Sequence, residues 1–322
     1  MNSGNNKMII ASCPLRVSLL GGSTDLEDFI THNGYGQVIS FPINLYTYVS
    51  INKRYDGKFL IQYSKTENVN KVSEIKNELV RTVLEYFNIN TPITVALNAD
   101  IPSHGSGLAS SSSFIIAMIK AASVFINLEL SDYEVCKIAL QLERKFNPLV
   151  GRQDAYGCGI KGFKHLYFES NKEIKTTLFS NTYFNNFDLF LIPISENGRK
   201  STKILKSLQL EERKSICDNV KLGIEYLESK NFSSFNDLIL NTWESKKKTS
   251  PLIVTPNVLE LENKIKTTKH SLYYKLCGAG GGGYLLLIKK KTDDISEFGL
   301  LKENSYIDIT VDNRGIKTWQ LN

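Results

Sequence analysis

Several features that would restrict the function are missing from this 322-residue sequence. No apolar run reaches the ~18 residues that a membrane-spanning helix needs, and the first ten residues lack the apolar core and cleavage site of a secretory signal. We therefore expect a cytoplasmic protein without membrane contact. The five cysteines form no CxxC pair and the four histidines do not cluster, so we expect buried free thiols, with neither disulfides nor a zinc site.

Signatures of nucleic-acid binding and of the commonest nucleotide sites are also absent. No GxxxxGK sequence followed by Ser or Thr occurs, which excludes a Walker-type phosphate loop. The net charge is +6, but no dense basic surface with interleaved aromatic residues appears, so we expect no nucleic-acid partner. The basic runs at 245–249 and 289–292 are predicted to be a solvated helix end and a solvated strand edge. A modest positive charge also suits an anionic small-molecule substrate.

The patterns that are present predict an α+β protein whose two halves pack together and meet near 175–185. Its composition, 42% apolar and 22% charged, is typical of a globular chain. For the first half we predict a strand over 8–20 that is interrupted at Pro14, antiparallel strands within 37–63 with a hairpin turn at 55–58, a helix over 72–88 and a strand over 92–102.

The middle of the chain is predicted to be helical. An apolar segment at 114–130 predicts a buried helix, and a capping box of Ser131 and Glu134 predicts another that runs to about Phe146. A glycine-rich loop is predicted over 150–162. The second half is predicted to contain a strand over 187–195, several helices within 200–268, and a strand, glycine loop and strand over 273–291.

The stretch from Ile101 to Phe114 reads IPSHGSGLASSSSF, directly before the buried helix. A helix start offers backbone N–H groups without helical partners and a partial positive charge, both of which suit a phosphate. Gly105 and Gly107 would let the backbone approach such an anion closely. Ser110, Ser111 and Ser112 could cap the helix, bond a phosphate oxygen or bind Mg²⁺. The alternative is an ordinary glycine-rich loop that ends in a serine N-cap.

Three motifs in chain order resemble those of the GHMP kinases, the superfamily of galactokinase, homoserine kinase and mevalonate kinase. The first is PLRVSLLGGSTD at 14–25, the second is the stretch at 101–114, and the third is KLCGAGGGGYLL at 275–286. The resemblance implies a two-domain fold, with a ribosomal-S5-like domain at 1–180 and a ferredoxin-like domain at 181–322. It also implies ATP and Mg²⁺ as cofactors, with ATP bound by Pro102, Gly105, Ser106, Gly107, Leu108, Ala109, Ser110, Ser111 and Ser112.

The third motif also contains the dinucleotide-binding pattern GxGxxG, in Gly278, Gly280 and Gly283. That pattern must lead into a helix, whereas here it leads into the strand-like segment YLLLI, which disfavours a dehydrogenase. By resemblance, the glycine loop forms the floor of the active site near the nucleotide phosphates. Gly280 and Gly281 are assigned to substrate binding on this basis.

Phosphoryl transfer needs a metal, a positioned hydroxyl and stabilisation of charge. By resemblance, Glu143 and Ser111 ligate Mg²⁺, and Asp154 orients or deprotonates the substrate hydroxyl. Arg16 stands where the family carries a basic residue, and beside Asp154 it would favour the ionised carboxylate. The alternative for either acid alone is a solvated carboxylate or a helix cap, and for Arg16 it is an anchor on a strand.

The Pro-Leu-Arg opening resembles one branch of the family, which contains kinases of D-glycero-D-manno-heptose 7-phosphate. That branch implies a sugar site at Gly22, Ser23, Thr24 and Asp25. The phosphate already on the sugar would need a cationic site, for which Arg199 and Lys200 are the first candidates and Arg152 the second. The alternatives are another sugar-1-kinase of the branch, such as an L-fucose kinase, and a sugar sensor without catalysis. The sequence does not predict the oligomeric state.

Overall fold

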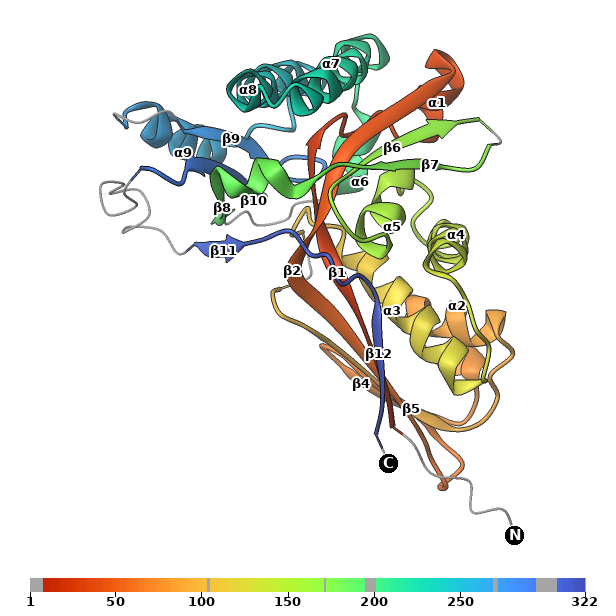
Figure 1. The fold of residues 1–322 in the computed structure, drawn as a ribbon. Coiled ribbons are helices and arrows are strands. Elements are labelled where there is room, and N and C mark those ends of the chain that lie inside the picture. The colour runs from red at the N-terminus through yellow and green to blue at the C-terminus, as the bar shows by residue number, and fades with distance from the viewer. Residues whose placement is uncertain are drawn as a thin grey trace.

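The computed structural model describes residues 8–102, 105–170, 172–194, 201–268, 272–293 and 306–321 (Figure 1). Along the chain the elements are β1 (Met8–Leu20), α1 (Glu27–Asn33), β2 (Tyr35–Lys53), β3 (Phe59–Gln62), β4 (Thr66–Val69), η1 (Val72–Glu74), α2 (Glu78–Tyr86), β5 (Ile93–Ala99), α3 (Ser110–Phe125), α4 (Asp132–Glu143), α5 (Arg152–Gly159), β6 (Lys164–Glu169), β7 (Lys175–Leu178), η2 (Asn181–Asn185), β8 (Phe187–Ile194), α6 (Ser201–Lys206), α7 (Leu210–Glu228), α8 (Phe232–Lys248), α9 (Pro256–Lys266), β9 (Tyr273–Leu276), β10 (Gly283–Lys290), β11 (Ile307–Ile309) and β12 (Lys317–Leu321).

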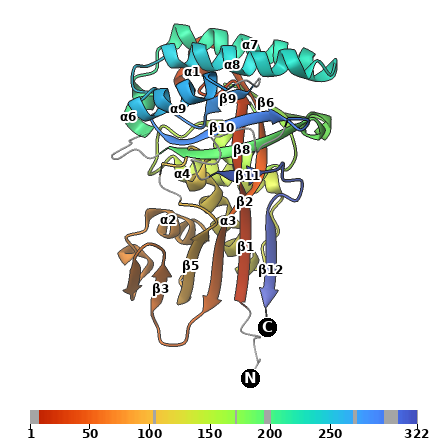
Figure 2. The same cartoon turned by 90° about the vertical axis from the view of Figure 1, so that its left-hand side faces the viewer.

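A large mixed sheet is built around the long strand β2. Its strand order is β12-β1-β2-β5-β3-β4, and the first part of β2 also pairs with β6, which pairs with β7. The strand β12, close to the end of the sequence, lies antiparallel to β1 in this sheet, although its residues fall in the predicted second domain (Figure 2). The predicted boundary at 180 follows the end of β7.

Helices α2 to α5 lie on one face of this sheet (Figure 1). The central helix is α3, whose apolar residues are buried almost all round, as the sequence predicted. It packs with the sheet and its neighbouring helices in one hydrophobic core. Because this core fixes α3 against β1, the start of the helix is held beside the first motif.

A second sheet has the strand order β11-β8-β10-β9, and helices α6 to α9 lie in the same half of the molecule (Figure 1). A second core joins the two halves, because it contains residues of β1 and β2 together with residues of β8, β10, α7 and α8. The two halves therefore share buried apolar surface, which supports the prediction that they are packed together. The α+β class is confirmed.

Three sequence predictions about the elements are wrong, and a fourth, the helix at 72–88, is right only in part. Strand β1 runs through Pro14 without interruption, because the pairing shifts register between Pro14 and Arg16, where a proline is tolerated. The turn at 55–58 does not join a hairpin, because β5 lies between β2 and β3 and pairs with β3 in parallel. The predicted helix at 72–88 is a short 3₁₀ turn followed by α2.

The third error concerns the predicted glycine-rich loop at 150–162, most of which is helix α5. Glycine lowers helix propensity, so the sequence favoured a loop. The glycines are needed for close packing instead. A Cβ on Gly157 would lie 3.1 Å from Cγ of Arg16, and one on Gly159 would lie 2.3 Å from Sγ of Cys136.

The predicted burial is correct for the cysteines and wrong for two lysines. The five cysteines are free and buried, as predicted. The basic runs, however, are not fully solvated, because Lys246 and Lys289 are only 6% and 3% exposed. No helix in the described part of the chain has both the length and the apolar character that a bilayer crossing requires.

Candidate active site

A cavity of about 550 Å³ lies where the three motifs meet. Its wall combines the first motif, the second motif, the α4–α5 connection, α6 and the third motif. The residues used below that line it are Arg16, Ser23, Asp25, Gly105, Ser106, Gly107, Ala109, Ser110, Ser111, Ser112, Glu143, Gly151, Gln153, Asp154 and Gly278. The tertiary structure thus brings together residues that are far apart in the sequence.

The N-terminus of α3 opens into this cavity without a side-chain cap. Its N-cap is Ala109, in the left-handed conformation with φ 61°, and no side-chain hydrogen bond caps the helix. The hydroxyls of Ser106 and Ser110 bond to each other at 2.9 Å. The alternative of a serine N-cap is therefore wrong, and the amide groups at the helix start stay available for an anion.

The second and third motifs pack closely against each other at their glycines. A Cβ on Gly278 would lie 2.5 Å from Cα of Gly107, and a Cβ on Gly283 would lie 2.5 Å from the carbonyl oxygen of Gly105. All four glycines have positive φ. The two loops can pack backbone to backbone only because both lack side chains at these points.

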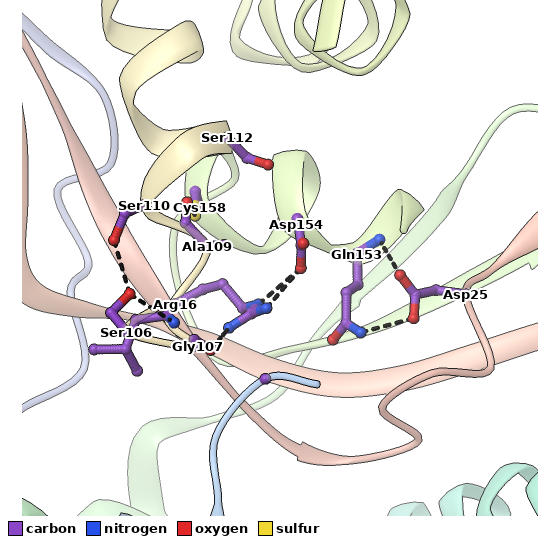
Figure 3. A network of polar contacts seen from close by, with 12 residues as sticks. Arg16, Asp25, Ser106, Gly107, Ala109, Ser110, Ser112, Gln153, Asp154 and Cys158 are labelled. Carbon is purple, nitrogen blue, oxygen red and sulfur yellow. Dashed lines mark hydrogen bonds and ion pairs between the residues drawn. The ribbon is translucent and has the colours of Figure 1, made fainter. Parts of the chain in front are cut away.

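Arg16 and Asp154 form an ion pair in the cavity wall (Figure 3). Nε and Nη2 of Arg16 both donate to Oδ1 of Asp154, at 3.2 and 2.6 Å, and Nη1 donates to the carbonyl oxygen of Gly107 at 2.8 Å. Burial lowers the pKa of Arg16, but the Asp154 carboxylate outweighs it and raises that pKa above its usual value. The guanidinium therefore stays charged and joins the acidic residue to the second motif.

Glu143, at the end of α4, faces the same serines. It is 1% exposed, and its Oε2 accepts a 2.5 Å hydrogen bond from the hydroxyl of Ser112. Burial raises the pKa of Glu143 to about 7, while the hydroxyls of Ser112 and Ser111 act in the opposite direction. The sequence predicted the hydroxyl of Ser111 as the partner, and the structure adds that of Ser112.

A carboxylate and two hydroxyls are hard oxygen donors, which fit Mg²⁺ if phosphates and water complete its shell. Within the described residues, no group of three or more His, Cys, Asp or Glu side chains is placed to hold a metal alone. A metal at Glu143 would therefore depend on the nucleotide for further ligands.

Asp25 is held by Gln153, a cavity residue that the sequence analysis missed (Figure 3). The backbone N–H of Gln153 donates to Oδ2 of Asp25 at 3.0 Å, and its Nε2 donates to Oδ1 at 2.7 Å. Burial, and next the charge of Asp154, raise the pKa of Asp25 to about 6. The amide oxygen of Gln153 is buried without a hydrogen-bond partner among the described residues. Its place directly before Asp154 was the only sequence signal.

Other predicted site residues have structural partners. The Thr24 hydroxyl donates to the carbonyl oxygens of Gly21 and Gln37, each at 2.8 Å, and so fixes the first-motif turn. The guanidinium of Arg152 donates to Glu27 and to the carbonyl oxygen of Glu169. None of the following predicted residues lines the cavity: Gly22, Thr24, Pro102, Leu108, Arg152, Gly280 and Gly281. Arg199 and Lys200 lie outside the described residues.

Known proteins resemble this chain in sequence and in fold. Residues 73–162 match the family model for the GHMP kinases N terminal domain. The chain is 29% identical to a D-glycero-alpha-D-manno-heptose 7-phosphate kinase of Campylobacter jejuni, over 98% of this chain and 100% of the relative. The chain therefore resembles the GHMP kinases in part of its N-terminal half and, more distantly, over nearly its whole length.

Solved structures of kinases have the same fold as this chain. A putative sugar kinase from Campylobacter jejuni has a TM-score of 0.76 at 23% identity and covers 99% of this chain and 100% of its own. A structure described as a D-glycero-D-manno-heptose 1-phosphate kinase from Bacteroides thetaiotaomicron has a TM-score of 0.78 at 19% identity, covering 98% and 99%. The relatives are named kinases, which supports a phosphotransferase with an alcohol acceptor.

Proposed function

We propose that this protein is a GHMP kinase that transfers the γ-phosphoryl group of ATP to the anomeric hydroxyl of D-glycero-D-manno-heptose 7-phosphate, forming the 1,7-bisphosphate. The observation that carries the proposal is the cavity in which the Arg16–Asp154 pair lies beside the uncapped start of α3. The choice of sugar is supported by the similarity to a heptose 7-phosphate kinase over 98% of the chain. The product would enter the synthesis of a nucleotide-activated heptose for surface polysaccharide.

In this proposal the nucleotide phosphates bind at the start of α3. The amide groups there and the close backbone approach at Gly105 and Gly107 would hold the phosphate oxygens. Glu143, Ser111 and Ser112 would hold Mg²⁺. When bound, this ion offsets the negative charge of the phosphates.

Asp154 would act on the sugar hydroxyl. Arg16 bonds only to Oδ1, and Oδ2 of Asp154 has no hydrogen bond with the described residues. The Asp154 side chain is 24% exposed, so Oδ2 can accept the hydroxyl proton as the sugar oxygen attacks the γ-phosphorus and ADP leaves. The guanidinium of Arg16 would stabilise negative charge that develops between these groups.

An ADP-release assay across hexoses, heptoses and their terminal phosphates tests this proposal. We expect Mg²⁺-dependent turnover with heptose 7-phosphate. Turnover only with an unphosphorylated sugar would indicate an L-fucose-kinase-like enzyme of the same branch. Sugar and ATP binding without turnover would indicate a sensor. Either result would refute the proposed substrate or reaction.

A further inference from the structure

Lys164, the first residue of β6, is buried against the C-terminal end of α5, the helix whose N-terminal end lines the active-site cavity. The lysine is 0% exposed. Its Nζ donates to the carbonyl oxygens of Gly157 and Gly162, at 3.1 and 3.3 Å, and to that of Ile160. A buried ammonium group is costly unless it forms hydrogen bonds, and here each of its three N–H donors has a carbonyl oxygen to meet.

These oxygens lie at the end of α5 that carries a partial negative charge. Gly157 is in the last turn of the helix, Ile160 is its C-cap, and Gly162 follows. The last carbonyl groups of a helix have no partners within it, and a cation at this end both bonds them and interacts favourably with the helix dipole. Lys164 therefore stabilises the end of α5 in a defined place.

The helix α5 needs such support because it is short. It has eight residues, and two of them are the glycines Gly157 and Gly159. Helices of this length are marginal in water, and glycine lowers helix propensity further. At the other end of α5, the carboxylate of Asp25 accepts from the backbone N–H of Gln153 at 3.0 Å. An anion at the first turn and a cation at the last turn thus fix α5 from both ends.

The face of α5 that Lys164 supports is the one that carries Asp154. Asp154 and Gly157 are three positions apart, so they lie on the same side of the helix. Both contact Arg16: Asp154 accepts from its Nη2 at 2.6 Å, and a Cβ built on Gly157 would lie 3.1 Å from its Cγ. The helix is therefore packed closely against Arg16, and a shift of its last turn would displace the Asp154 carboxylate.

We propose that Lys164 is a positioning residue, whose ammonium group fixes the C-terminal end of α5 and thereby holds the Asp154 carboxylate in the place that phosphoryl transfer requires. This inference rests on the proposed function and deepens it. Lys164 is not among the described residues that line the cavity, so its effect on rate passes through Asp154. A lysine that only stabilised the fold would change the amount of folded enzyme and leave each active site as it is.

The test measures ADP release from ATP and D-glycero-D-manno-heptose 7-phosphate by Lys164→Met. The kcat is expressed per nucleotide-binding site, counted by titration with an ATP analogue, which removes any loss of folded protein from the comparison. We expect kcat to fall about 10- to 100-fold, as for a reacting group displaced by about 1 Å. The KM for ATP should stay within about threefold, because the nucleotide is expected at the start of α3.

The same change made in an Asp154→Asn background separates positioning from a general loss of structure. The asparagine cannot accept the proton, so its position matters little, and Lys164→Met should lower the remaining kcat by less than about threefold. Lys289→Met is the matched control. Lys289 is 3% exposed, donates to the carbonyl oxygens of Lys290 and Asp293 at 2.9 Å each, and lies outside the cavity lining. Its removal should leave kcat per site unchanged in both backgrounds.

If Lys164→Met does not fold, Lys164→Gln replaces it in both backgrounds. This variant keeps two N–H donors at the helix end, and we expect its kcat per site to fall at least about threefold. A smaller fall in the variant that folds would refute the inference. Equal losses with and without the Asp154 carboxylate would also overturn it, because Lys164 would then not act through that group.

Failure of the proposed function would look different. Absence of turnover with the phosphorylated heptose in the unmutated enzyme would refute the proposed reaction, and the inference with it. Full activity of Asp154→Asn alone would refute the role of Asp154, whatever Lys164 does.

Discussion

Replacement of Asp154 by Asn separates proton transfer from the binding of both substrates. The amide keeps an oxygen at the Oδ1 position, where Arg16 donates twice, so the positions of Arg16 and the second motif should persist. At the Oδ2 position the variant presents an NH₂ group, which cannot accept the proton of the sugar hydroxyl. A positioned general base contributes about 10²- to 10⁴-fold to rate, so we expect kcat to fall by that factor.

The assay is ADP release at saturating ATP and sugar, combined with an equilibrium titration of an ATP analogue. The nucleotide affinity of the variant should stay within about threefold of the unmutated value, because Asp154 is expected to touch the sugar and not the nucleotide. Asp132→Asn is a matched control, since that aspartate lies in the first turn of α4 and outside the cavity, and it should leave turnover unchanged.

A kcat above about one-tenth of the unmutated value would refute the assignment of Asp154 as the base, because orientation of the hydroxyl alone would then suffice. A loss of nucleotide affinity together with the loss of kcat would also contradict the assignment of Asp154 as the base, for another reason. Asp154 would then act by holding Arg16 and the second motif in place, and the loss of rate would reflect a displacement of that motif.

Three further predictions follow from the same contacts. Gln153→Met should lower kcat/KM for the sugar about tenfold with an unchanged KM for ATP, since it removes the amide oxygen that has no internal partner and its tie to Asp25; equal effects on both substrates would contradict this. Gly278→Ala should destabilise the fold by more than about 2 kcal/mol in urea unfolding, because the new Cβ meets the second motif's backbone at a positive φ; an unchanged midpoint would argue against that contact. Although burial raises the pKa of Asp28, the hydrogen bonds and charge of Arg213 hold it below its usual value. The stability from this pair should therefore be present above the unfolded pKa of about 3.9 and disappear as pH falls through the folded pKa. Asp28→Asn should cost about 1 kcal/mol at pH 7, a value reduced for the 55% exposure of the Asp28 side chain, and a cost that persists at pH 2 would contradict the linkage.

Much of the fold and site could be predicted because the decisive features are local. Glycines and serines followed by an apolar segment predict the start of α3. The capping box of Ser131 and Glu134 predicts the start of α4. Such signals depend on how the free backbone N–H groups at a helix start form hydrogen bonds, which involves only a few adjacent residues. The roles of Asp154 and Glu143 came from the resemblance of three motifs to the GHMP kinases, and these roles remain proposals.

The errors arose where distant segments decide a local conformation. Residues 152–159 form a helix despite their glycines, because those glycines let α5 approach Arg16 and Cys136 closely. The turn at 55–58 suggested that β3 pairs with β2 in a hairpin. In the sheet, however, β5 comes from later in the sequence and takes the place beside β2, so β3 pairs with β5 instead.

The amino-acid sequence by itself determined the class of fold and the glycine- and serine-rich stretch before α3, because these depend on residue type and short spacing. Only the tertiary structure decided that Arg16 meets Asp154 across 138 positions, that Gln153 holds Asp25, and that Lys246 is buried beside Gly278. A lysine in a basic run resembles any solvated lysine until the chain folds around it. Burial and charge balance belong to the packed molecule, and local sequence does not encode them.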